Sequence, residues 1–371
     1  MRRLRELATI KAIVKHRWVS YHDPLYEYPQ NYQPRIRRMT DLLPIGWMAL
    51  VVVLWGAVWG SFANVVIARM PRGKSIAFPA SHCPECKTPI RWFDNLPIVS
   101  WLVLRGRCRA CKAPISIRYP LVEAGGILCS VAAAWAVSGG WSLWRLAQAP
   151  PLELVSAWML LSFFFLILMM LTLIDLAHLL LPHRLTISLA VLAVVYAYIV
   201  PPGGAWRGFV PSLTVREALL GFVVAYGALF LFAMVYAIVR GRQGMGGGDF
   251  MLFGALGAWF GMEALPMLML LAALQGVLMY LVALLFFPAL IHEIDPEDEE
   301  FWAARVGEEP TTEHAPVRAP ATPHAETTDA AAASSAPSTQ RGVPFGPFLC
   351  LAAVEFVAFG GLYMQWLNGG L

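Results

Sequence analysis

The stretch LELVSAWMLLSFFFLILMMLTLI, residues 152–174, decides the fold class, because it is apolar almost throughout and its single carboxylate, Glu153, lies near its start. About 20 apolar residues in a helix are enough to cross a bilayer. The rest of the chain has the same character: 58% of its 371 residues are hydrophobic, 14% are charged, and the mean hydropathy is +0.59. This composition excludes an ordinary soluble domain and favours a membrane protein.

Other apolar tracts of similar length lie on both sides of this stretch. The longest, at 250–290, could hold two helices, and Gly261, Glu263 and Pro266 predict a break near its middle. The sequence therefore predicts an all-α, polytopic membrane helix bundle with about eight transmembrane helices. The remaining tracts are 43–68, 119–139, 184–200, 216–239 and 343–366.

The positive charges are distributed unevenly between the loops. Residues 69–118 carry ten Lys and Arg, and the 240–249 connection carries two more. The loops on the other side carry Arg145, Arg207 and Arg216. Because basic loops stay on the cytoplasmic side of a membrane, we expect the 69–118 loop to be cytoplasmic. The same pattern is a topology signal and does not indicate a nucleic-acid partner.

Two segments have no apolar span. The basic extension before residue 43 has no continuous apolar core, so it does not resemble a cleaved signal peptide. With eight crossings, this basic extension would lie outside the cytoplasm, which the preference of basic segments for the cytoplasmic side disfavours. The extension could be an interfacial amphipathic helix, or translation could start at Met39 or Met48. The acidic and Pro/Ala-rich segment before the last helix predicts a disordered linker. We expect these divisions: extension 1–42, first membrane helix 43–70, cytoplasmic loop 71–118, membrane core 119–290, linker 291–342 and last membrane helix 343–371.

Four of the six cysteines form two Cys-x-x-Cys pairs in the basic loop. Cys83, Cys86, Cys108 and Cys111 have nearly the spacing of a two-knuckle zinc ribbon, in which four thiolates surround one ion. With four protein ligands, no position remains for water, so the zinc ion should be structural. A redox dithiol, or thiols without a ligand, is the alternative. Cys129 and Cys350 lie in apolar tracts, which favours a reducing compartment over disulfides.

Four carboxylates border or interrupt the apolar tracts: Glu123, Asp175, Asp249 and Glu263. A charge at a helix centre costs about 2.5–3.5 kcal/mol on insertion scales, so each of them needs an explanation. For any one alone, the simplest explanation is that it marks a helix end. Asp175 and Asp249 differ because the predicted topology places both at the cytoplasmic face. His178, one turn after Asp175, could tune that carboxyl or simply lie at the interface.

Asp249 follows the glycine run 246–248. No Lys-Ser/Thr pair follows the run, which argues against a phosphate-binding loop. Glycines instead free the backbone for conformations closed to other residues, so that an extended peptide could approach Asp249. Two close carboxyls share one proton: the ionised one takes a proton from water, and the protonated one stabilises the oxyanion. The pair therefore predicts aspartic peptidase chemistry.

Several motifs occur in an order that resembles the bacterial type IV prepilin peptidases, membrane aspartic peptidases with a Gly-x-Gly-Asp motif. The resemblance covers most of residues 43–366. It implies Asp175 and Asp249 as the catalytic pair and the four loop cysteines as zinc ligands. The similar segments are GSFANVVIARMP at 60–71, DNLPIVS at 94–100, RYPLVE at 118–123, IDLAHLLLP at 174–182, GGGD at 246–249 and PFGPFL at 344–349.

The resemblance also implies a function. Members of this family cut the basic leader from prepilins or pseudopilins after a glycine, and many then methylate the new amino terminus with S-adenosylmethionine. We therefore expect a multi-pass enzyme of the bacterial inner membrane, serving a type IV pilus or protein secretion, with its active site facing the cytoplasm. Ala177, His183 and Met251 depart from residues that are frequent in the family, which leaves substrate preference and the surroundings of the carboxylates open.

Two other classes of protein remain as alternatives. The carboxylates could relay ions in a transporter, with the cysteine loop as a gate. The chain could also be a non-catalytic assembly factor, for which Cys83 would matter and Asp249 would not.

Overall fold

The structure, a computed structural model, describes residues 43–138, 151–200, 213–241, 245–286 and 345–367. Within these ranges the regular structure is helical, apart from two isolated β-bridges. The predicted extension 1–42 and linker 291–342 lie outside the described residues. The helices of more than ten residues are α2 (Leu43–Arg69), α4 (Arg118–Ser138), α6 (Pro151–His178), α7 (His183–Ile199), α8 (Val215–Arg240), α9 (Gly247–Phe260), α10 (Leu265–Phe286) and α13 (Gly346–Leu367).

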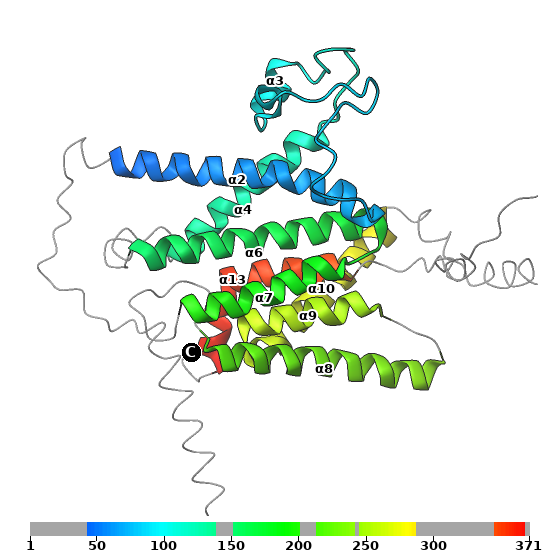
Figure 1. Cartoon of the computed structure of the whole chain (residues 1–371). Helices are drawn as coiled ribbons and strands as arrows, with labels where there is room; N and C mark the ends of the chain where they lie inside the picture. The colour runs from blue at the N-terminus through cyan, green and yellow to red at the C-terminus, as the bar shows by residue number, and fades with distance from the viewer. Residues whose placement is uncertain (1–42, 139–150, 201–212, 242–244, 287–344, 368–371) are drawn as a thin grey trace, which may run out of the picture. The chain divides into compact units, whose positions relative to one another are not determined.

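These helices confirm the all-α prediction, and each predicted tract holds a helix (Figure 1). The predicted break in the 250–290 tract is confirmed as well. α9 ends at Phe260, Gly261 has a φ of 79°, and the short helix η4 (Met262–Ala264) precedes α10. A positive φ suits glycine because it has no Cβ, so this residue turns the chain between the two helices.

Five described helices are long and apolar enough to cross a membrane, and α7 and residues 346–360 of α13 are shorter apolar helices. α9 has only 14 residues, fewer than the roughly 20 of a full crossing. The count of eight crossings therefore stays a prediction. The five long segments are Gly46–Arg72, Arg118–Ser138, Leu152–His178, Val215–Arg240 and Met262–Val282.

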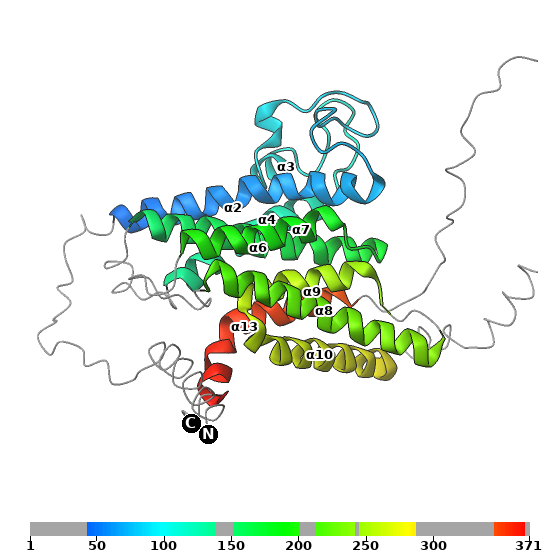
Figure 2. The ribbon, with the colours of Figure 1, turned by 60° about the horizontal axis from the view of Figure 1, so that its bottom comes forward.

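Glycines let α2 and α4 pack with their backbones in contact. A Cβ atom added at Gly56 would lie 2.6 Å from the carbonyl oxygen of Gly126, and one added at Gly60 would lie 2.8 Å from that of Glu123. Gly56 and Gly60 are four residues apart, the small-xxx-small spacing that brings membrane helices close together. This contact fixes α2 and α4 side by side, as Figures 1 and 2 show.

α9 is buried between its neighbours because α7 packs on it and α8 covers it. The ring of Trp259, only 1% exposed, lies 4.5 Å from the Phe164 ring of α6 and 5.1 Å from the Tyr196 ring of α7. Its Nε1 donates a hydrogen bond to the carbonyl oxygen of Leu189, 3.0 Å away. The short helix is thus enclosed by its neighbours over most of the stretch from Phe250 to Phe260.

The described chain falls into two compact units. One comprises the helices up to Ala273 together with α13, and it contains the cysteine loop and both predicted aspartates. Within this unit the carboxyl-terminal end of α6 and the amino-terminal end of α9 lie on the same side (Figure 1). The other unit, Leu274–Val343, is described only for the remainder of α10.

Candidate active site and metal site

Asp175 lies in the last turn of α6 and is 5% exposed. The helix ends three residues later, where Leu179 adopts a φ of 51° and its N–H donates to the carbonyl oxygen of Asp175 at 2.8 Å. A left-handed residue just after a helix is a common way to end it, although leucine is strained there. Pro182 then precedes α7, so the predicted redirection of the chain in this region is confirmed.

Asp249 is the third residue of α9, and its side chain is partly exposed. Its Oδ2 accepts a hydrogen bond of 3.3 Å from the backbone N–H of Gly246, the residue that caps the helix. A carboxylate in this position also faces the positive end of the helix dipole. The start of α9 therefore holds the Asp249 carboxylate in a defined orientation.

The glycine run 246–248 was predicted to adopt backbone conformations closed to other residues, and this prediction is wrong. Gly246 has a φ of −83°, and neither Gly247 nor Gly248 is among the glycines of positive φ. What requires a glycine is close packing: a Cβ added at Gly248 would lie 2.7 Å from Cβ of Leu181. Gly248 thus lets the first turn of α9 approach the segment that follows Asp175.

The two aspartates are near enough to interact electrostatically, although they are 74 positions apart in the sequence. The first turn of α13 also contacts Asp175. The backbone N–H of Gly346 donates a hydrogen bond to the Asp175 carboxylate, and a Cβ added there would lie 2.7 Å from its Oδ2. The same Cβ would lie 3.0 Å from Cδ2 of Leu181. Leu181 therefore packs between the two glycines, one beside each aspartate.

A buried thiol lies beneath the pair. Cys350, one turn after Gly346 on α13, interacts electrostatically with both aspartates and is hydrogen-bonded to the side chain of Thr172. The sequence offered Thr172 and Cys350 only as parts of apolar tracts. Gly346 and Leu181 did stand inside motifs of the family resemblance, but nothing in the sequence indicated that they contact Asp175 or each other.

The remaining residues that the sequence analysis singled out near the aspartates are not part of this packing. His178 is exposed, as are Ala177 and His183, two of the departures from the family pattern. Met251, the third departure, is partly buried in the first turns of α9. Glu263 is in η4, at the opposite end of α9 from Asp249, so the structure does not bring it to the aspartates.

The cysteine loop is built from two similar knuckles offset by 25 residues. In the first, the N–H of Cys83 donates to the carbonyl oxygen of Thr88 and that of Lys87 to Cys83. In the second, Cys108 donates to Ala113 and Lys112 to Cys108. Both Lys87 and Lys112 have a positive φ, and both knuckles have a β-bridge at their base. SHCPECKTPI at 81–90 and GRCRACKAPI at 106–115 show this relation in the sequence.

The knuckles bring four sulfur atoms together, all within 4.8 Å of one another. The Sγ atoms of Cys83 and Cys111 are 3.8 Å apart, and those of Cys86 and Cys108 are 4.0 Å apart. Four sulfurs at about 2.3 Å from a zinc ion in a tetrahedron are about 3.8 Å apart. The donor set therefore fits one metal ion and leaves no open position. His82 is not part of the set.

Local hydrogen bonds affect the cysteine thiols and connect parts of this loop. Hydrogen bonds with the side chain and backbone of Thr88 lower the pKa of the Cys86 thiol to about 6. The pKa of Cys111, despite its backbone hydrogen bond with Ala113, is raised to about 11 by desolvation and the neighbouring cysteines, so the four thiols do not share one tendency to ionise. Near the second knuckle, Arg109 donates to both oxygens of Asp94, with distances of 2.6–3.0 Å. These bonds hold the pKa of Asp94 below its usual range, and they tie the 92–95 turn (η3) to the knuckle.

Glu123 joins the loop to the membrane helices. Its side chain is buried, its Oε2 accepts a hydrogen bond of 2.7 Å from the N–H of Ile98, and it also bonds the side chain of Ser61 on α2. Ile98 has a φ of 61°, which is rare for a β-branched residue. The sequence indicated only that Glu123 marks a helix end or a motif position. In the structure, Glu123 is hydrogen-bonded to Ile98, a strained residue of the loop.

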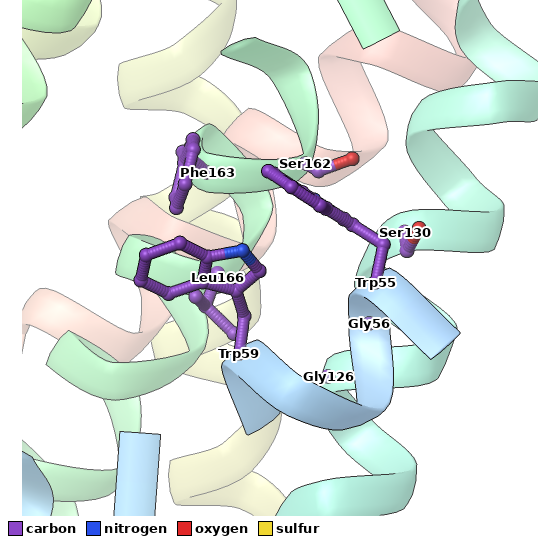
Figure 3. A pocket seen from close by; sticks show the side chains of 8 residues that line it. All are labelled: Trp55, Gly56, Trp59, Gly126, Ser130, Ser162, Phe163 and Leu166. Carbon is purple, nitrogen blue, oxygen red and sulfur yellow. The ribbon is translucent and has the colours of Figure 1, made fainter. Parts of the chain in front are cut away.

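A shallow cleft lies where α2, α4 and α6 meet, away from the aspartates, and it has no enclosed space for even a water molecule. Figure 3 shows the rings of Trp55, Trp59 and Phe163 lining it. Leu166, its lining residue closest to Asp175 along α6, is nine residues before it, which is two and a half turns and thus the opposite face of the helix. The cleft is too small for most cofactors, whose sites measure roughly 300 Å³ or more.

Fold and sites together define a class: an all-helical membrane protein with a four-cysteine loop and an acidic pair at one end of its bundle. Comparison with known families agrees with this class. Residues 54–137 match the "Bacterial Peptidase A24 N-terminal domain", and residues 162–281 match the "Type IV leader peptidase family". The chain belongs to the type IV leader peptidase family. A search of solved structures found no match.

Curated relatives match about two thirds of the chain. A protein of Aeromonas hydrophila named "Prepilin leader peptidase/N-methyltransferase" is 36% identical over 62% of this chain and 79% of its own length. Proteins with the same name from Pectobacterium carotovorum subsp. carotovorum and Neisseria gonorrhoeae are 34% and 36% identical, over 67% and 66% of this chain and 87% and 85% of their own lengths. The family named in the sequence analysis is thereby confirmed.

Proposed function

We propose that this chain is a membrane aspartic endopeptidase that removes the basic leader of type IV prepilins or pseudopilins after a glycine and then N-methylates the new terminal residue. The relatives' shared name supports both activities. The observation that carries the peptidase half is the packing of Leu181 against Gly248, which precedes Asp249, and against Gly346, which lies beside the Asp175 carboxylate.

The proposed reaction uses the two aspartates in different protonation states. The ionised carboxylate takes a proton from a water molecule, whose oxygen attacks the carbonyl carbon of the scissile peptide bond. The protonated carboxylate donates a hydrogen bond to the developing oxyanion. When the tetrahedral intermediate collapses, the carboxyl that took the proton from water gives it to the peptide nitrogen, which leaves as the new amino terminus.

We propose zinc as the metal of the loop, held by Cys83, Cys86, Cys108 and Cys111. The zinc ion would hold the two knuckles together and would take no part in cleavage, since its four ligands are all protein. N-methyl transfer implies S-adenosylmethionine as the methyl donor. We assign no residue to this donor, because the cleft beside α2 is too small for it.

The membrane position follows from the charges. We place the loop and the aspartates on the cytoplasmic side of the bacterial inner membrane, because residues 69–118 carry ten Lys and Arg against two acids, Glu85 and Asp94. A prepilin would lie with its apolar helix among the lipids and its basic leader in the cytoplasm, where the aspartates would meet it.

Processing in cells tests this function. Cells that make prepilin should accumulate the uncut precursor when Asp175→Asn or Asp249→Asn replaces the wild-type chain, and should process it normally with Glu153→Gln, an acid at the other end of α6. Normal processing by both aspartate variants would refute the peptidase. Ion flux in vesicles that is lost in the same variants while cleavage persists would favour a transporter instead. Mass spectrometry of the processed pilin decides whether the new terminus is methylated.

A further inference from the structure

The short helix α3 (Val99–Val103) in the cysteine loop exposes an apolar face. Its residues Val99, Leu102 and Val103 are 54%, 61% and 70% exposed. Their spacing of three and four residues puts them on one side of the helix. We call these three residues the α3 face. Just before the helix, Trp92 is 79% exposed, so the apolar surface of this part of the loop is not limited to the helix itself.

Hydrogen bonds and packing fix the level of α3 along the membrane helices. Ile98, the residue before α3, is bonded to Glu123, and the backbone of Glu123 packs on Gly60 of α2. Gly60 is nine residues before the end of α2 at Arg69, a distance of roughly 13 Å along the helix. α3 therefore begins at a level within the length of α2 and not beyond its end, as Figures 1 and 2 show, although it lies apart from that helix.

Two arginines lie on either side of the α3 face in the sequence. Arg91 and Arg105 flank the segment and are exposed. Of the two acids in the loop, Asp94 is already paired with Arg109, which leaves Glu85 in the first knuckle. Arginine and tryptophan around an apolar surface are the composition of a membrane interface, and basic side chains there attract anionic lipids. An aqueous surface would not favour three aliphatic side chains on one face.

We propose that the α3 face is a membrane-contact surface: Val99, Leu102 and Val103 enter the boundary between headgroups and acyl chains of the leaflet on the loop side, and Arg91 and Arg105 bind anionic phospholipid headgroups. The cysteine loop is thus held in two ways: the α3 face contacts the bilayer, and the bond between Glu123 and Ile98 ties the loop to α4. It is independent of which peptide the enzyme cuts.

Photo-crosslinking of the full chain in lipid nanodiscs tests this surface without any substrate. The photoreactive p-benzoylphenylalanine replaces Val103 in one variant and Glu85, on the first knuckle, in a matched control. We expect lipid adducts at position 103, several-fold above those at position 85, when the nanodiscs contain phosphatidylglycerol. Equal yields at the two positions, no adduct, or an adduct only to another segment of the protein would overturn the proposal.

Lipid charge tests the arginine half separately. In the Val103 crosslinking variant, Arg91→Gln with Arg105→Gln should lower the adduct yield several-fold in nanodiscs with phosphatidylglycerol and leave it unchanged in phosphatidylcholine alone. Yields that do not depend on lipid charge or on the two arginines would overturn the headgroup contact. Zinc content, measured in each variant, shows whether the loop has kept its fold.

Discussion

The cysteine loop and the aspartate site differ in how far apart their residues lie along the chain. The four cysteines lie within 83–111, and each knuckle is closed by hydrogen bonds between near neighbours. The aspartate site draws on α6, α9, α13 and Leu181, which extend from 172 to 350. A site of the first kind depends on local turns, whereas a site of the second kind depends on how helices pack. Substitutions at helix contacts should therefore damage the aspartate site much more than the loop.

The largest effect should follow from filling the contact between α13 and Asp175. In Gly346→Ala, the new methyl group would stand 2.7 Å from Asp175 Oδ2 and 3.0 Å from Leu181, so the carboxylate or the helix must move. Misplacing a catalytic group by about 1 Å costs roughly 100-fold in rate, and we expect at least that loss of leader cleavage by purified protein. Gly247→Ala is the matched control, because a Cβ there meets nothing within 4 Å. Similar rates for the two variants would contradict the packing described for this site.

A smaller effect on cleavage should follow from loss of the metal. Cys83→Ser removes one of four ligands, so we expect bound zinc to fall from about one ion per chain to a small fraction of that. Because the knuckles are remote in the chain from α9 and α13, cleavage should fall by less than about tenfold, well short of the roughly 100-fold loss expected for a misplaced carboxylate. Metal analysis and initial cleavage rates check both parts. Cys129→Ser, in α4 outside the loop, should keep the metal; a loss of cleavage in Cys83→Ser as large as in Gly346→Ala would show that the two sites are not separable.

The smallest effect should follow from releasing the loop from α4. Glu123→Ala removes the acceptor of the Ile98 N–H, and hydrogen bonds to charged groups contribute about 1.5–3 kcal/mol. Hydrogen exchange at Ile98 should therefore become faster by about tenfold or more, while the helices of the bundle keep their protection. Glu85→Ala, in the first knuckle, should change nothing at Ile98. Unchanged exchange in Glu123→Ala would mean that other contacts hold the loop.

The same difference explains what the sequence could predict. Apolar tracts gave the helices and the break at Gly261, because length and composition decide a membrane span. The cysteine spacing predicted that the four sulfur atoms come together, because a knuckle needs only local turns. The place of α13 could not be predicted: Gly346 is 171 positions after Asp175, and only helix packing brings its N–H to that carboxylate. Gly248 was assigned a role in backbone freedom, whereas its role is close packing, which a sequence pattern does not distinguish.

Glu123 and the knuckles show two further limits. A carboxylate near a helix end looks the same in a sequence whether it is solvated or bonded to a distant loop, so the contact with Ile98 carried no signal. The relation between SHCPECKTPI and GRCRACKAPI, in contrast, was visible in the sequence at an offset of 25 residues. A comparison of the two Cys-x-x-Cys segments would have predicted that both knuckles adopt one backbone conformation.

The most direct test of the proposed aspartate pair compares its single and double variants. Initial rates of leader cleavage are measured for purified wild type, Asp175→Asn, Asp249→Asn and the double variant, with Glu153→Gln as the control. Residues that act as one unit are not additive, so each single variant should lose nearly all activity and the double variant should be no slower than either. Substantial cleavage by one single variant, or losses that multiply in the double variant, would contradict a shared mechanism for Asp175 and Asp249.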